Sequence, residues 1–192
     1  MGLEFELKYR ATPEKIAAIR NAVSSAEQHF LMQTTYYDTP SGELSKRHWT
    51  LRCRQENQTS VCTLKLPAPE GRAEFELECQ RIEDALVELC KLSGQTELLL
   101  LARQGLVPVC GARFQRIAKT LSLASCTVEL ALDTGILLGG DRELPLCEIE
   151  VELKAGTPEA ACAYGEALAQ TYGLQPETAS KFRRALALAK GE

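Results

Sequence analysis

The sequence predicts an α+β fold in which an antiparallel sheet has one charged face and one apolar face covered by helices. Two observations lead to this prediction. Several segments alternate charged and apolar residues with period two, which is typical of strands with two different faces. Other segments begin with capping residues and continue with apolar residues at helical spacing. The chain has 192 residues and no linker rich in Gly, Pro or Ser, so we expect a single domain, residues 1–192.

The helical segments are marked mainly by how they begin. A Thr-Pro-Glu sequence at 12–14 predicts the cap and first turn of a helix that runs to about residue 26. The same three residues at 157–159 precede an Ala-rich segment that ends near residue 173. Apolar spacing predicts further helices over the ranges 82–92, 95–105 and 178–190.

Six strands share one arrangement, with charges on one face and apolar side chains on the other. They are expected within the ranges 3–9, 51–54, 62–66, 72–79, 128–133 and 147–154. Arg52 and Arg54 lie on the same face, about 7 Å apart by the rise of a strand. Glu4 and Glu6 form a similar pair of carboxylates. Like charges this close repel by roughly 1 kcal/mol or more where water is partly excluded, so this face is expected to bind groups of opposite charge.

Two architectures satisfy this pattern. In the first, an open sheet exposes its charged face to water and packs its apolar face on helices. In the second, the sheet curls until its charged face lines a wet tunnel, and helices cover the apolar exterior. The grouping of like charges, in place of opposite charges paired across strands, favours the tunnel. The cations of such a tunnel would suit a polyanion, and its carboxylates would suit a divalent metal ion.

Composition argues against several classes of function. A net charge of −4 and an isoelectric point near 5.4 are unlike those of a nonspecific nucleic-acid binder, so no nucleic-acid partner is expected. No apolar run approaches the roughly 20 residues that span a bilayer, and the start lacks a signal-peptide pattern. We therefore expect a cytoplasmic protein without a membrane partner. The 8 cysteines are scattered and are interpreted as free thiols at apolar positions. A homodimer through an outer helix or strand face is compatible with these features.

The charged segments also resemble those of a known family. Glu4-Phe5-Glu6-Leu7-Lys8 is similar to the Glu-x-Glu-x-Lys opening of the CYTH domain, whose members are also called triphosphate tunnel metalloenzymes. Further similar segments follow in the expected order: Tyr36-Tyr37-Asp38-Thr39, Leu51-Arg52-Cys53-Arg54, Thr63-Leu64-Lys65, Arg72-Ala73-Glu74, Phe114-Gln115-Arg116, Glu129 to Gly135, Glu148-Ile149-Glu150 and Ser180-Lys181. The resemblance implies an eight-stranded antiparallel β-barrel, or tunnel, with a charged interior and helices packed on the outside.

The resemblance also implies roles for the matched residues. Phosphate oxygens would be bound by Lys8, Arg52, Arg54, Lys65, Arg116 and Lys181. A metal ion, Mg²⁺ or Mn²⁺, would be held by Glu4, Glu6, Asp133, Glu148 and Glu150, with Glu74 and Glu129 as additional inward carboxylates. The catalytic residues would be Glu4, Glu6 and Lys8. Arg183 and Arg184 are expected to be solvated, whereas the roles of Arg113 and Lys119 are left open.

The activity implied is metal-dependent hydrolysis of a triphosphate-containing small molecule. Direct attack by water is expected, because no arrangement of His, Ser or Cys suggests a nucleophile. The resemblance is greatest to the inorganic triphosphatases, which cleave tripolyphosphate to pyrophosphate and phosphate. A class IV adenylate cyclase, a thiamine triphosphatase and a non-catalytic polyphosphate-binding module are the alternatives. The general base is left open between a tunnel carboxylate and Lys8, the latter on condition that its neighbours depress its pKa. Trp49 is expected in the core or at an interface, and one residue of the pair Tyr36–Tyr37 in the core.

Overall fold

The computed structural model describes residues 2–69 and 71–192, with side chains from residue 5 onward. The strands are β1 (Gly2–Glu4), β2 (Glu6–Arg10), β3 (Gln28–Asp38), β4 (Thr50–Glu56), β5 (Thr59–Pro67), β6 (Arg72–Glu78), β7 (Val107–Ser122), β8 (Cys126–Gly139), β9 (Arg142–Gly156) and β10 (Gln175–Pro176). The helices are α1 (Pro13–Ala22), α2 (Glu43–Lys46), α3 (Ile82–Ser93), α4 (Glu97–Ala102), α5 (Pro158–Tyr172) and α6 (Lys181–Lys190). No helix in this part of the chain is long and apolar enough to cross a membrane.

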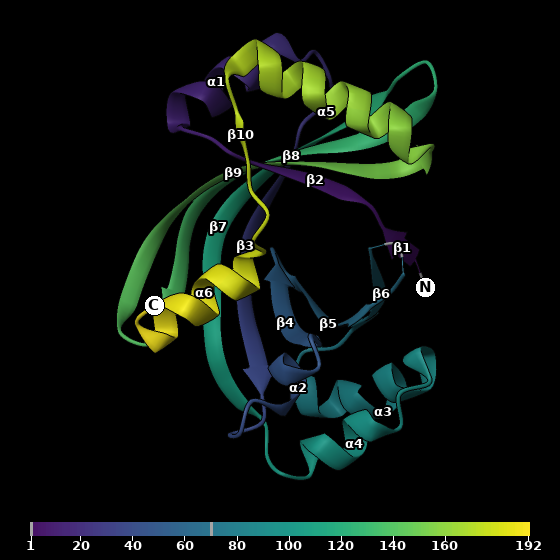
Figure 1. The fold of residues 1–192 in the computed structure, drawn as a ribbon, viewed down its shortest axis with the longest axis vertical. Helices are drawn as coiled ribbons and strands as arrows, with labels where there is room; N and C mark the ends of the chain where they lie inside the picture. Colours follow the sequence, from purple (N-terminus) through teal and green to yellow (C-terminus); the bar gives the residue numbers. More distant parts are fainter. Residues whose placement is uncertain (1, 70) are drawn as a thin grey trace.

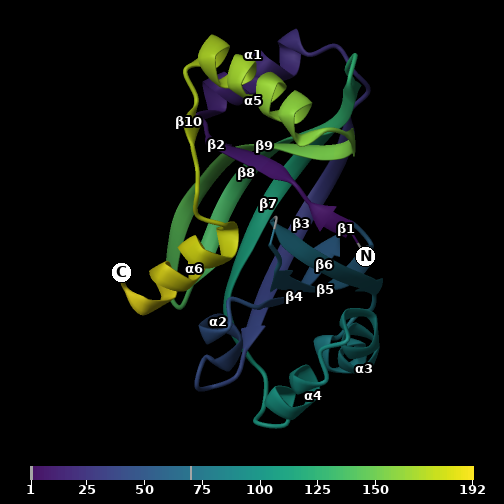
Figure 2. The ribbon, with the colours of Figure 1, turned by 45° about the vertical axis from the view of Figure 1, so that its right-hand side comes forward.

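The N-terminal segment joins the two ends of the sheet. The hydrogen-bonded order is β1-β6-β5-β4-β3-β7-β8-β9-β2-β10, and the paired strands are antiparallel. β1 pairs with β6, whereas β2, which follows it after Phe5, pairs with β9 (Figures 1 and 2). With β1 and β2 taken as one strand and the two-residue β10 set aside, the described residues form the eight-stranded tunnel that was predicted.

Two groups of helices cover the apolar exterior of the tunnel (Figure 1). α1 and α5 pack over β2, β8 and β9, where they bury residues such as Ile19 and Val151. α3 and α4, together with the short α2, cover β4, β5 and β6 and bury residues such as Leu64 and Leu89. Each such aliphatic side chain contributes roughly 1.5–3 kcal/mol by its burial. Because side chains alternate along a strand, the charged residues of the same strands face the tunnel.

α6 differs from the other helices because it packs against the tunnel face of β7, β8 and β9. Ala185 of this helix is buried with Met32 and Phe114, which point inward from β3 and β7. Gly139 allows the close approach, since a Cβ atom there would lie 2.5 Å from the backbone nitrogen of Ala189. α6 therefore fills one end of the tunnel.

The predicted helix starts at Thr12 and Thr157 are confirmed. The hydroxyl oxygen of each residue accepts a backbone N–H of the first turn, at 3.4 Å in both cases. α1 ends four residues earlier than expected, at Ala22. At this end the buried Nζ of Lys119 donates to the carbonyl oxygens of Arg20 at 2.7 Å and Val23 at 2.6 Å, and so satisfies carbonyl groups that the helix leaves without a partner.

The alternation of charges does not predict β3, because its tunnel face carries Phe30, Met32, Thr34 and Tyr36. The ring of Tyr36 lies 5.0 Å from that of Phe182 on α6, centroid to centroid. Tyr37 packs against the outer core, as expected for one residue of the pair. Trp49 is buried in that core, as predicted, and the eight cysteines are free thiols.

Candidate active site in the tunnel

The tunnel encloses a cavity of about 310 Å³ that is lined mostly by charged side chains. The lining cations are Lys8, Arg52, Arg54, Lys65, Arg72, Arg116, Lys154 and Lys181. The lining carboxylates are Glu6, Glu56, Glu74, Glu76, Glu129, Glu150 and Glu152. Because these carboxylates nearly balance the cations, a polyanion would bind best together with metal ions that neutralise the carboxylates.

One group of charges, the buried cluster, lies where α6 enters the tunnel. It consists of Asp133, Glu148 and Glu150 with Arg116, Lys181 and Arg184. Lys181 Nζ lies 2.8 Å from Asp133 Oδ2 and 2.7 Å from Glu150 Oε1, and it also donates to Glu148. Arg116 forms a fork with Asp133, at 2.8 Å and 2.7 Å, and also donates to Glu150. Lys181 therefore sits among three carboxylates like a bound cation.

The sheet register creates this cluster. Arg116 of β7 is directly opposite Asp133 of β8, which is opposite Glu148 of β9 on its other side. In the next row, Glu150 is opposite Ala131, a small residue that leaves room for the heads of longer side chains. Ser180 begins α6 by accepting the N–H of Arg183 at 3.2 Å, and this start directs Lys181 toward the carboxylates.

The carboxylates and cations of the buried cluster set each other's charge. Burial alone would raise the pKa of Glu150, but Lys181 and Arg116 outweigh it and hold this pKa well below its usual range. Burial alone would lower the pKa of Lys181, and the three carboxylates raise it. Burial also raises the pKa of Glu148 to about 7, although Lys181 and Arg184 oppose that shift. Lys181 and Glu150 are therefore an ionised pair at neutral pH.

A second group, the open wall, projects into the cavity from β4, β5 and β6. It consists of Arg52, Arg54, Lys65, Arg72, Glu74 and Glu76. Arg52 Nη2 and Lys65 Nζ each lie 3.1 Å from the same oxygen of Glu74. Arg54 Nε donates to Thr34 Oγ1 at 3.1 Å, and burial, together with the nearby guanidinium of Arg52, lowers the pKa of Arg54. A bound anion would stabilise the charged form of Arg54.

Three carboxylates form an acidic row across the opposite side of the tunnel. Glu6 of β2 is directly opposite Glu152 of β9, which is directly opposite Glu129 of β8. Lys8 pairs with Glu6 at 2.7 Å, and Lys154 pairs with Glu152 at 2.8 Å. Like charges directly opposite one another destabilise a sheet. Ligands made only of oxygen fit Mg²⁺ or Mn²⁺, so this donor set suits a divalent ion.

The buried carboxylates offer another arrangement of metal ligands. Among the described residues, Asp133, Glu148 and Glu150 place one oxygen each within 4.8 Å of one another. However, Lys181 already contacts all three, and neither Asp133 nor Glu148 lines the cavity. A metal ion would reach their oxygens only if Lys181 moved away, whereas Glu150 can be reached from the cavity.

The structure brings most residues of the predicted site to one cavity. Those that line it are Glu6, Lys8, Arg52, Arg54, Lys65, Glu74, Arg116, Glu129, Glu150 and Lys181. The side chain of Glu4 lies outside the described residues; its backbone pairs with that of Arg72. Lys8 was a candidate for the general base on condition that its neighbours depress its pKa, and the structure does not meet that condition. Burial would lower this pKa, but Glu6, Glu150 and Glu148 raise it, so Lys8 is a cation and not a base at neutral pH.

Sequence reasoning missed several residues of the site. The expectation that Arg184 is solvated is wrong, because this residue is half-buried and donates to Glu148. Arg183 is exposed, as expected. Arg184 lies one helical turn after Lys181, and this spacing was the available signal. Arg72 and Lys154, which strand parity places on the charged face but to which no role was assigned, also line the cavity.

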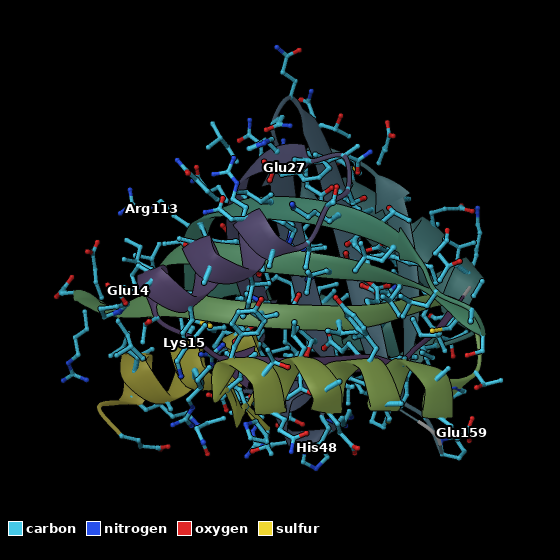
Figure 3. The ribbon with its side chains drawn as sticks, turned by 90° about the horizontal axis from the view of Figure 1, so that it is seen from above. Glu14, Lys15, Glu27, His48, Arg113 and Glu159 are labelled. Carbon is cyan, nitrogen blue, oxygen red and sulfur yellow. The ribbon has the colours of Figure 1, made fainter. Side chains whose placement is uncertain are left out.

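The two residues left open on β7 lie outside the cavity. Lys119 caps α1, and Arg113 pairs with Glu143 at 3.2 Å. Figure 3 shows Arg113 at the periphery of the molecule. Strand alternation explains the difference from Arg116, because residues at odd separations point to opposite faces.

Comparison with known proteins agrees with this architecture. The family model of the CYTH domain matches residues 2–186. The inorganic triphosphatase of Haemophilus influenzae is 28% identical, over 94% of this chain and 53% of its own length. A relative from Bacillus subtilis is 34% identical over 83 residues, which are 43% of this chain and 44% of the relative. The chain spans about half the length of these curated relatives.

Solved structures share the fold at low sequence identity. A protein from Hippeastrum, described as having a dominant triphosphatase activity, superposes with a TM-score of 0.68 at 20% identity, over 98% of this chain and 95% of that one. The PH1819 protein of Pyrococcus horikoshii gives a TM-score of 0.64 at 22% identity, over 98% of this chain and 99% of that one. These similarities establish the fold. Because the family model covers nearly the whole chain, the protein belongs to the CYTH domain family.

Proposed function

We propose that this protein hydrolyses a triphosphate in its tunnel with a divalent metal ion, Mg²⁺ or Mn²⁺. The proposed substrate is inorganic tripolyphosphate, which would be cleaved to pyrophosphate and phosphate. The observation that carries the proposal is the enclosed cavity into which cations project from opposite walls, among them Arg52 and Lys65 on one side and Lys8 on the other. The similarity to an inorganic triphosphatase supports the choice of substrate.

The open wall is proposed to bind the phosphate chain. Arg52 and Arg54 suit two-pronged contacts with phosphate oxygens, while Lys65 and Lys8 supply point charges. Arg54 gains most from a bound anion, because neighbouring cations and burial disfavour its charge in the absence of one. Arg116 and Lys181, fixed by the buried carboxylates, would present cations at the end of the cavity where α6 lies.

The acidic row is proposed to hold the metal, together with Glu150 and, as the sequence resemblance implies, Glu4. A bound divalent ion would polarise phosphate oxygens and neutralise charge that develops on them. Asp133 and Glu148, also expected as ligands, contact cations in this structure. We propose that they contribute mainly by fixing Arg116 and Lys181.

Water is proposed to attack the terminal phosphorus in line with the leaving pyrophosphate. The site offers charge stabilisation and positioning, which are the main requirements of phosphoryl transfer. Lys8 would stabilise negative charge, since its raised pKa keeps it protonated. Of the two candidates for the general base, a carboxylate facing the cavity therefore remains.

Substrate turnover tests this proposal. Purified protein would be incubated with tripolyphosphate, ATP or thiamine triphosphate in Mg²⁺ or Mn²⁺, and phosphate, pyrophosphate and cyclic AMP would be measured. We expect fastest release of phosphate from tripolyphosphate, its loss on chelation and its recovery when metal is restored. Cyclic AMP from ATP would instead identify a cyclase, and faster turnover of thiamine triphosphate a thiamine triphosphatase. Binding of tripolyphosphate without turnover would identify a polyphosphate-binding module and overturn the proposal.

Two arginine variants on β7 compare the effect on hydrolysis of a cation in the tunnel with that of a cation on the outer surface. Arg116→Met removes a cation that lines the cavity, whereas Arg113→Met removes an exposed one. We expect hydrolysis to fall at least tenfold in the first variant and to stay within twofold of the parent in the second.

The cytoplasmic location, the lack of nucleic-acid and membrane partners, the homodimer and the single-domain organisation of residues 1–192 stay predictions.

A further inference from the structure

A strap, residues 174–180, leads from the end of α5 to the start of α6 and crosses the edge of the tunnel (Figure 1). Its first part forms β10, in which Gln175 and Pro176 pair with Arg10 and Tyr9 of β2. Glu177 then donates its backbone N–H to the carbonyl oxygen of Lys8 at 2.8 Å. The strap is therefore fixed to the same strand that carries Glu6 and Lys8 into the cavity.

The side chain of Glu177 fixes the strap a second time. It is 2% exposed, and its Oε2 accepts from Arg10 Nε at 2.7 Å and lies 3.7 Å from Arg184 Nη1. Its Oε1 accepts the backbone N–H of Ala179 at 2.9 Å. One buried carboxylate therefore links β2, the strap and α6 at the point where α6 begins.

Arg184 connects this link to the buried cluster. Its Nη2 donates to Oε2 of Glu148, while the other oxygen of Glu148 accepts from Lys181. Arg184 is not among the residues that line the cavity, whereas Lys181 is. Among the described residues, the Nε atom of Arg184 is buried and has no hydrogen-bond partner. The contacts of the guanidinium with Glu148 and Glu177 therefore leave one of its donors unsatisfied.

We propose that Arg184 is a positioning residue for hydrolysis, which acts by fixing Glu148 and the start of α6 so that Lys181 presents its charge to the tunnel. This inference depends on the proposed function and adds to it a residue that touches neither the cavity nor the substrate. With Arg184 in place, Glu148 shares its two oxygens between two cations of α6. Without it, one oxygen of the fully buried Glu148 side chain loses its partner, so Glu148 and the start of α6 no longer fix the position of Lys181.

The first test compares neighbouring arginines of α6. Arg184→Met removes the guanidinium, Arg184→Lys keeps the charge, and Arg183→Met is the matched control, because Arg183 is exposed. For tripolyphosphate hydrolysis we expect kcat to fall about tenfold in Arg184→Met with KM changed less than threefold. Arg184→Lys should recover part of the loss, and Arg183→Met should match the parent. An unchanged kcat in Arg184→Met would overturn the proposal.

A double-mutant cycle with Lys181 separates positioning from general loss of stability. If Arg184 acts through Lys181, the tenfold effect of Arg184→Met should shrink to less than twofold in a Lys181→Met background. A purely structural role would reduce kcat by the same factor in both backgrounds, and that result would overturn the proposal. Circular dichroism and thermal unfolding establish the folded fraction of each variant.

Two further measurements cover failure of folding or of the proposed activity. If Arg184→Met does not fold, Glu177→Gln tests the same link with a side chain of equal size. We expect a smaller loss of kcat that also vanishes in the Lys181→Met background. If the parent binds tripolyphosphate without hydrolysing it, the proposed function fails, and the same cycle is measured on the dissociation constant. Equal effects on binding in both backgrounds would then overturn the role of Arg184 separately.

Discussion

The buried cluster and the open wall use the same residue types for different purposes. In the buried cluster, Asp133 and Glu148 have side chains that are 0% and 1% exposed, and each contacts two cations. In the open wall, the side chains of Glu74 and Glu76 are 18% and 46% exposed. Arg52 and Lys65 share one oxygen of Glu74 at 3.1 Å, and both face the cavity.

This difference indicates which charges a ligand can use. Buried pairs with complete contacts are rigid, and breaking them leaves a charge without compensation. Partly exposed pairs that share a carboxylate are screened by water, and they exchange that carboxylate for a phosphate at lower cost. We therefore expect substitutions in the buried cluster to affect stability most, and substitutions in the open wall to affect binding most.

The largest expected effect is on the free energy of unfolding of a buried-cluster variant. Asp133→Asn removes a charge that contacts both Arg116 and Lys181, and we expect a loss of about 3–5 kcal/mol. Glu74→Gln is the matched control from the open wall, with an expected loss of about 1 kcal/mol or less. Urea denaturation at pH 7 measures both. Equal losses would show that burial does not separate the two groups.

The next effect is on anion binding by the open wall. Removing a charge-assisted hydrogen bond costs about 1.5–3 kcal/mol, so Arg54→Met should weaken tripolyphosphate binding by roughly 10- to 150-fold. Its melting temperature without ligand should not fall, because burial and Arg52 already disfavour this charge. Calorimetric titration and thermal unfolding measure the two quantities. A lower melting temperature together with unchanged affinity would reverse the roles assigned to the wall and the cluster.

The features that sequence reasoning predicted are local ones. Alternation with period two depends only on neighbouring residues, and it placed Arg52, Arg54 and Glu150 on the tunnel face. The choice between a tunnel and an open sheet depends on pairing between distant strands, which alternation along one strand does not reveal. The resemblance to the CYTH family supplied that information, since it links segments from both ends of the chain.

The features that were missed depend on tertiary contacts. β3 carries no alternating charges, because Met32 and Phe30 of its tunnel face pack in the apolar cluster that includes Ala185 of α6. Arg184 resembles any surface cation of a helix until α6 is known to lie against the tunnel face. Lys119 likewise acts on carbonyl oxygens of α1, which the local sequence around it does not reveal.

A smaller effect is expected for one carboxylate of the acidic row. Glu6→Gln keeps the size of the side chain but removes a charge opposite Glu152, and we expect Mn²⁺ binding in the presence of tripolyphosphate to weaken about tenfold. Glu14→Gln is the control, because Glu14 lies on α1 away from the cavity. Calorimetric titration with Mn²⁺ gives both affinities. Unchanged affinity in Glu6→Gln would show that Glu6 does not hold the metal ion.

The smallest effect concerns a group of charges outside the tunnel, which serves as a reference for the buried cluster and the open wall. Glu27 contacts Arg20 at 2.7 Å, Lys119 at 3.2 Å and His29 at 3.1 Å, and lies near the outside of the molecule (Figure 3). Its hydrogen bond with Arg20 is the main cause that lowers its pKa from 4.5 to about 2. The folded protein therefore holds this proton less tightly than the unfolded chain, so its stabilisation is complete above pH 4.5 and is lost as the pH falls toward 2.

Glu27→Gln should consequently be slightly less stable than the parent at pH 7, and the difference should disappear on acidification through that range. Added salt should also reduce the difference, because the carboxylate is near the surface and is screened. Hydrolysis of tripolyphosphate should not change, since Glu27 is not among the residues that line the cavity. Thermal unfolding from pH 7 to about pH 2 measures the difference. A difference that grows on acidification would show that the Glu27 carboxylate does not stabilise the fold through its contacts with cations.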